Sequence, residues 1–228
     1  MEIPVPVRDM PHWRVNFRPE EFKPESVPGI QGLFELIERT AVSFRGWNYP
    51  HISSRPAERL AGTDYVASWA DFMGHVEYWR LYQSGQFLHL FSVPEVANQD
   101  WRNKYAHLEA PGIFSIKNFL FTMTEIFEFA ARLAQHRLYS GKVAIRIDLK
   151  QIRGFALVTD FDRMLTGRYE AREEALGKVW EFESEDLMLD RAVIAIDAVI
   201  WFFERFGWRN PPRAVLESDQ AALISGRF

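Results

Sequence analysis

The chain has no cysteine among its 228 residues. This absence excludes a disulfide scaffold, a cysteine-ligated zinc or iron–sulfur centre and a cysteine nucleophile. The longest apolar run, 192–203, is shorter than the roughly 20 residues of a membrane-spanning helix, and it carries Asp197. The first residues lack the basic and apolar regions of a signal peptide. We therefore expect a soluble, cytoplasmic protein without a membrane partner.

Local motifs of enzymes and cofactor sites are also missing. There is no GxxxxGK[ST] phosphate loop, no GxGxxG, no GxSxG, no HExxH and no calcium-binding loop. The net charge of −4 provides no basic field, so we do not expect nucleic acid as a partner. We predict no cofactor and no metal site. Enzymatic activity stays open, because histidine and carboxylate chemistry needs no local motif.

Aromatic residues and arginine are abundant. The chain has 19 Phe, 8 Trp and 7 Tyr, and its 27 basic residues are mostly arginine. Arginine binds carboxylate and phosphate through two parallel hydrogen bonds, and it stacks on aromatic rings. This composition favours a binder of anionic or planar ligands, although the base composition of the genome also explains many arginines.

The hydrophobic pattern predicts an α+β fold: a mainly antiparallel sheet built from hairpins and packed against about three long helices. Helical spacing indicates helices over 28–44, 115–138 and 185–206. Alternation or β-rich composition indicates strands around 13–18, 76–82, 86–93, 143–150, 154–159, 178–184 and 214–216. We expect one globular domain over 1–228, with a two-part organisation, 1–110 and 111–228, as the alternative.

The segment 76–93 is the first candidate site. Two aromatic and β-branched runs flank Ser84-Gly85, which predicts a β-hairpin. With a two-residue turn, one face of the hairpin carries an arginine–histidine pair surrounded by four rings. That face would bind an anionic or planar ligand, unless a helix covers it. It contains Tyr78, Arg80, Tyr82, Phe87, His89 and Phe91.

The loop 45–55 is the second candidate. Arg45, Trp47 and His51 lie close together between turn-forming residues. Loops carry binding residues more often than core elements do. The competing interpretation is an ordered connection whose rings close the edge of the domain.

Two weaker patterns concern catalysis or metal binding. His75 and Glu77 would point to one side of a strand, but two residues do not specify a metal site. Asp148 and Lys150 have the spacing of a nuclease-like strand, with Asp160 and Asp162 as further acceptors. Here a solvated strand face with alternating charge is the competing interpretation.

These patterns favour a non-enzymatic binding, sensor or adaptor module, or a subunit of a complex. Its ligand would be a small anionic or planar molecule, or a protein partner, held on the aromatic–arginine surface. The alternative is a metal-dependent hydrolase or nuclease that uses Asp148 and Lys150. The helix 185–206 is apolar on most of its surface, which predicts an interface helix and a homo-oligomer.

Overall fold

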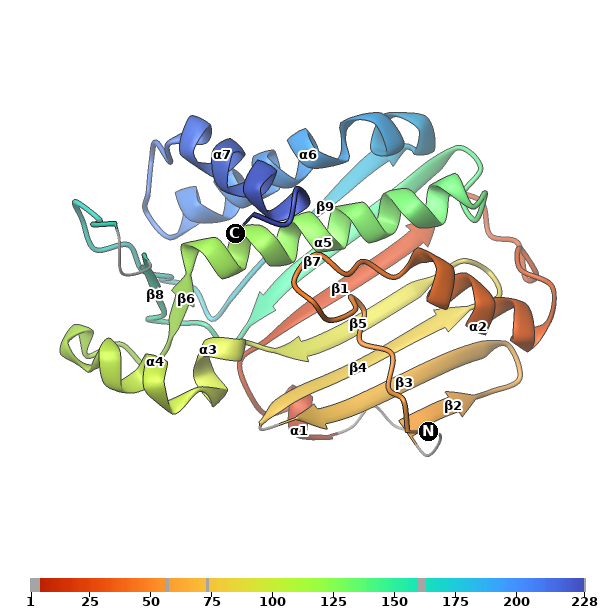
Figure 1. The fold of residues 1–228 in the computed structure, drawn as a ribbon, viewed down its shortest axis with the longest axis horizontal. Helices are drawn as coiled ribbons and strands as arrows, with labels where there is room; N and C mark the ends of the chain where they lie inside the picture. Colours follow the sequence, from red (N-terminus) through yellow and green to blue (C-terminus); the bar gives the residue numbers. More distant parts are fainter. Residues whose placement is uncertain (1–4, 56–57, 73, 160–162, 228) are drawn as a thin grey trace.

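The computed structural model describes residues 5–55, 58–72, 74–159 and 163–227, which form an antiparallel sheet with helices on one side (Figure 1). The sheet has seven strands in the order β2-β3-β4-β5-β1-β7-β9. The α+β prediction is confirmed. The strands are β1 (His12–Pro19), β2 (Arg59–Ala61), β3 (Tyr65–Phe72), β4 (His75–Tyr82), β5 (Phe87–Ser92), β7 (Lys142–Lys150) and β9 (Ala175–Glu183).

Four longer helices lie on one side of this sheet in Figure 1, and all contribute to one hydrophobic core. They are α2 (Gly29–Thr40), α5 (Ile116–Gln135), α6 (Ser184–Arg205) and α7 (Arg213–Ile224). Shorter elements join them: α1 (Val5–Arg8), α3 (Pro94–Ala97), α4 (Gln99–Lys104), a 3₁₀ turn η2 (Ala106–Leu108) and the parallel strands β6 (Ile113–Ser115) and β8 (Ala156–Val158).

Helix α5 is the centre of the helical layer. Ser115 caps it by accepting a hydrogen bond from the Asn118 backbone N–H at 3.2 Å. Phe119, Phe127 and Phe129 are fully or almost fully buried. The wide apolar surface of this helix is buried because the sheet lies on one side of it and α6 on another.

The C-terminal helices agree only in part with the prediction. Ile196 on α6 is 1 % exposed, but Leu189 and Val193 on the same helix are 78 % and 53 % exposed. Self-association through this helix stays a prediction. The strand predicted over 214–216 is wrong, because α7 occupies that segment. A three-residue pattern could not reveal the helical spacing of its buried residues, Leu216, Gln220 and Leu223.

The two faces of the sheet differ in what they contact. On β1, Trp13, Val15 and Phe17 point into the core, while Arg14 and Arg18 alternate with them and are exposed. We call the face that carries these arginines, on the side opposite α5, the open face. Helix α1 covers part of it, where Val7 packs against Tyr78 and Leu90.

Within the described residues, no helix has the length and apolar character needed to cross a membrane.

The hairpin β4–β5 is confirmed, but its predicted register is wrong by one residue. The turn has three residues, because the Tyr82 backbone N–H donates to Gln86 O at 2.9 Å and Gly85 N–H donates to Tyr82 O at 2.9 Å. Gly85 has a φ of 85°, the left-handed conformation that this turn needs at its third position. Arg80 therefore pairs with Leu88, and His89 pairs with Trp79. This shift moves His89 to the core face.

Candidate functional site

A hollow of about 560 Å³ lies on the open face at the end where β1 begins and β7 ends. We call it the cation hollow. Three segments contribute its basic residues: Arg8 from α1, Arg14 from β1 and Lys150 from β7. Antiparallel pairing of β1 with β7 places Arg14 beside Asp148 and His12 beside Lys150. The remaining lining residues are Leu88, Leu90, Gln151, Glu174 and Ala175.

The three cations of the hollow have no side-chain partner among the residues that the structure describes. The side chains of Arg8, Arg14 and Lys150 make no hydrogen bond or ion pair within the part of the chain that the structure describes. Most other arginines pair with a carboxylate, as do Arg39, Arg45, Arg55, Arg59, Arg132, Arg146, Arg153, Arg163, Arg168, Arg191, Arg205 and Arg213. The cation hollow is thus a place where positive charge is left unneutralised.

Two hydrogen bonds hold the walls of the cation hollow together. Gln151 Nε2 donates to the backbone carbonyl of Arg8 at 2.6 Å, which ties α1 to the end of β7. His12 Nδ1 lies 2.8 Å from the Met10 carbonyl oxygen. Burial lowers the pKa of His12, and the nearby charges of Lys150 and Arg14 lower it further, against the bond to Met10. The cations therefore disfavour a further positive charge on His12.

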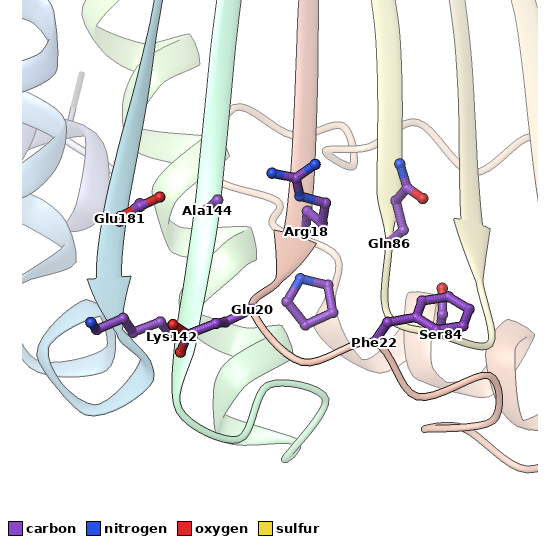
Figure 2. Close-up of a pocket in the computed structure, with 9 residues that line it drawn as sticks. Arg18, Glu20, Phe22, Ser84, Gln86, Lys142, Ala144 and Glu181 are labelled. Atoms are coloured by element: carbon purple, nitrogen blue, oxygen red, sulfur yellow. The ribbon is translucent and has the colours of Figure 1, made fainter.

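A second hollow lies on the open face at the opposite end of β1, with a volume of about 380 Å³ (Figure 2). Its charges are mixed: Arg18 and Lys142 share it with Glu20 and Glu181. Figure 2 shows Glu181, Ala144 and Arg18 on neighbouring strands, with Gln86 and Phe22 at the other side of the hollow. Because acids balance its cations, this hollow is less suited to an anion than the cation hollow is.

Tyr78, Arg80 and Tyr82 lie together on the open face, as the hairpin pattern indicated. Arg80 Nε donates to the Tyr78 hydroxyl and Nη1 to the Tyr82 hydroxyl, both at 2.9 Å. Its guanidinium also stands 4.1 Å from the centre of the Tyr65 ring. Arginine is favourable over an aromatic face at this distance. We call these four residues the tyrosine–arginine cluster; its role in ligand binding stays a prediction.

His89 lies away from that cluster, inside the core. It is 1 % exposed, and its Nε2 bonds to Glu77 Oε1 at 2.9 Å. Its Nδ1 lies 3.0 Å from the Tyr49 hydroxyl. The expected contact of His89 with Arg80 is wrong, because the three-residue turn places the two side chains on opposite faces of the sheet.

The loop 45–55 packs against the core face near this histidine. His51 donates its backbone N–H to Glu77 Oε1 at 2.7 Å, and its carbonyl accepts from Trp79 Nε1 at 2.6 Å. Arg45 forms a buried pair with Glu125 on α5, with Nε 3.0 Å from Oε1, and its guanidinium lies 5.0 Å from the Trp47 ring centre. Burial raises the pKa of Glu125, although Arg45 opposes the shift. These contacts anchor the loop to the sheet and to α5.

Glu77 is the centre of this buried polar network. Its carboxylate accepts from His51 N–H and His89, and it lies 3.4 Å from His75 Nε2. Burial acts to raise its pKa, but the charge of His89 and the hydrogen bonds from both histidines outweigh burial and hold the pKa far below its ordinary value. His75 and Glu77 therefore lie on the same side of β4, as the sequence indicated, and His89 is a second histidine that contacts Glu77.

Ser92, His75 and Glu77 form a relay that resembles a nucleophile, a base and an orienting acid. Ser92 Oγ lies 3.3 Å from His75 Nδ1. However, Ser92 is 1 % exposed, and its Oγ also accepts the Val76 backbone N–H at 3.0 Å. A substrate carbonyl cannot approach this hydroxyl, so the relay joins β4 to β5 instead of serving as a nucleophile.

Asp148 and Lys150 share the open face but do not form a carboxylate cluster. Asp148 is 1 % exposed and accepts three hydrogen bonds from Arg146 at 2.8–3.1 Å. A Cβ on Gly177 would overlap its carboxylate, so glycine makes room for this pair. Asp160 and Asp162 lie outside the described residues. Within the described part of the chain, no group of three or more metal-ligating side chains is present.

Sequence reasoning missed the cation hollow. Its cations, histidine and amide come from positions 8, 12, 14, 150 and 151, and they are brought together by the pairing of β1 with β7 and by the hydrogen bond from Gln151 to the Arg8 carbonyl. The alternation of Arg14 and Arg18 with buried residues was the available signal.

No family model, curated protein or solved structure matches this chain.

Proposed function

We propose that this protein is a non-enzymatic binding module that takes a small anionic ligand on the open face of its sheet. One observation carries the proposal: Arg8, Arg14 and Lys150 line the cation hollow, and their side chains have no hydrogen-bond or ion-pair partner among the described residues. Unpaired cations that share a small space repel one another, and an anion removes that repulsion. Each charge-assisted hydrogen bond that it accepts is worth about 1.5–3 kcal/mol.

The cation hollow is built on a rigid support. Arg14 and Lys150 stand on β1 and β7, two adjacent strands that are paired on both sides, and Gln151 fixes the backbone of Arg8. Such preorganisation lowers the entropy cost of binding. The lining offers cations, an amide and apolar side chains, which suit capture of an anion. Tyr65, Arg80 and Tyr82 of the tyrosine–arginine cluster are partly exposed on the same face, so they extend the surface for a planar part of the ligand.

The same proposal places the protein in the cytoplasm and treats it as a sensor, adaptor or subunit whose output depends on bound anion. The Asp148–Lys150 hydrolase alternative has less support, because the Asp148 carboxylate is already occupied by Arg146.

A calorimetric titration tests the proposal. The probes are sodium phosphate, pyrophosphate and citrate at constant ionic strength, with chloride as the reference anion. We expect at least one multivalent anion to bind the protein and Arg14→Ala to weaken its affinity at least 10-fold, equivalent to about 1.4 kcal/mol. Arg209→Ala is the matched control, because Arg209 is exposed and lies in the loop between α6 and α7.

The proposal is wrong if none of the three multivalent anions binds more tightly than chloride. It is also wrong if Arg14→Ala and Arg209→Ala bind the anions as the unmodified protein does. A melting curve of each variant without ligand shows whether the fold is retained.

A further inference from the structure

We infer that the ligand of the cation hollow is an organic diphosphate whose phosphates contact the cations and whose organic part lies on the partly exposed Leu88. This inference rests on the proposed function and specifies its ligand. Its grounds are the number of charges, the types of cation and the apolar floor of the hollow.

The number of charges selects a multivalent anion. Arg8, Arg14 and Lys150 contribute three positive charges. Among the described residues one acid, Glu174, lines the hollow, and its Oε2 lies 3.8 Å from Nε of Arg153, which does not line it. A single carboxylate would neutralise one of the three cations and leave the other two repelling each other. A diphosphate carries enough negative charge to balance all three.

The types of cation favour phosphate oxygens. A guanidinium offers a planar fork of donors that matches two oxygens of one phosphate, while the lysine ammonium acts as a point charge. Two arginines and one lysine from three segments surround the hollow. This arrangement suits two linked tetrahedral groups with several oxygens, because each guanidinium can take a separate phosphate.

The volume of the hollow and its apolar lining indicate that the ligand has an organic group as well as phosphates. A volume of about 560 Å³ lies in the range of pockets for small organic molecules, which is roughly 300–1,000 Å³. Leu88 is half-buried on β5, and it pairs with Arg80 on one side and with Asn16 on the other. An apolar or planar group on Leu88 would therefore lie between the cations and the tyrosine–arginine cluster.

His12 offers a second way to detect an anion bound in the hollow. The groups that face it are Lys150, Arg14 and Asp148 together with the Met10 carbonyl, and Arg8 and Glu174 line the same hollow. The bond to Met10 leaves Nε2 available to donate once the ring is protonated. A diphosphate in the hollow offsets the cations, so binding should be accompanied by uptake of a proton.

The experiment compares four probes by calorimetry: orthophosphate, pyrophosphate, adenosine diphosphate and citrate. We expect pyrophosphate to bind at least 10-fold more tightly than orthophosphate and citrate. We expect adenosine diphosphate to bind at least 5-fold more tightly than pyrophosphate. Leu88→Ser should remove the advantage of the nucleotide while leaving pyrophosphate unchanged. Arg18→Ala is the control, because Arg18 lies on the open face but outside the cation hollow. It should change neither the affinity for pyrophosphate nor the affinity for adenosine diphosphate.

The outcomes separate the two claims. If citrate binds as tightly as pyrophosphate and Arg14→Ala abolishes both, the anion-binding function stands and the diphosphate inference is overturned. If pyrophosphate and the nucleotide bind equally and Leu88→Ser has no effect, the organic part of the inference is overturned. If no probe binds, both claims fail.

Discussion

Replacing Glu77 by glutamine tests the buried network beneath the sheet. The substitution keeps the size of the side chain but removes the charge that accepts from His51 N–H at 2.7 Å and from His89 at 2.9 Å. Glu77 is only 8 % exposed, so water cannot replace the lost interactions. Hydrogen bonds to a charged group are worth about 1.5–3 kcal/mol, against about 0.5–1.5 kcal/mol for neutral pairs. For two such bonds we expect a loss of about 2–3 kcal/mol in the free energy of unfolding at pH 7.

The stabilisation by Glu77 should depend on pH, because its carboxylate has a lower pKa in the folded protein than in the unfolded chain. The folded pKa of Glu77 is far below its unfolded value of about 4.3, so its stabilisation is fully present above that pH. It is lost as the pH falls toward the folded pKa, because the unfolded carboxylate takes up a proton first. The stability difference between the unmodified protein and Glu77→Gln should therefore narrow below about pH 4.3.

Urea unfolding at pH 7, 5 and 3 measures this difference, and the melting temperature at pH 7 should fall by roughly 4–12 °C. Glu173→Gln is the control, because Glu173 is exposed and makes no ion pair within the described residues. A constant difference between pH 7 and pH 3, or a loss below about 0.5 kcal/mol, would refute the assignment of Glu77 as the charged centre of the network.

Three further changes test other parts of the molecule. Ile196→Ala should lower the free energy of unfolding by about 2–5 kcal/mol in urea titrations, since Ile196 is 1 % exposed in the core; a loss under about 1 kcal/mol would contradict this packing. Arg80→Ala should lower the melting temperature, because two tyrosine hydroxyls lose their donor; an unchanged melting temperature with weaker anion binding would assign Arg80 to the ligand instead. The affinity for pyrophosphate should rise from pH 8 to pH 6 more steeply in the unmodified protein than in His12→Gln, as titration calorimetry can measure; equal slopes would separate His12 from the bound anion.

Local patterns of the sequence determined several of the elements, although not α7. The alternation of Val143, Ile145, Ile147 and Leu149 with polar residues predicted β7, because a strand with one buried face must alternate. The broad apolar surface of 115–138 predicted a central helix, because such a surface must be covered on more than one side, and α5 spans Ile116–Gln135. Both depend on residues that are close together along the chain, and both were confirmed.

Only the tertiary structure decided which side chains meet. One extra residue in the turn after Tyr82 moved His89 from the predicted binding surface to the carboxylate of Glu77. The residue types in a turn do not show whether the turn has two residues or three. A change of one residue in turn length moves every side chain of the following strand to the opposite face of the sheet. Likewise, Arg14 and Lys150 become neighbours because β1 pairs with β7 across more than a hundred residues, and Arg8 joins them because α1 packs on β4 and β5. Long-range pairing follows from how the whole core packs, and no local pattern encodes it.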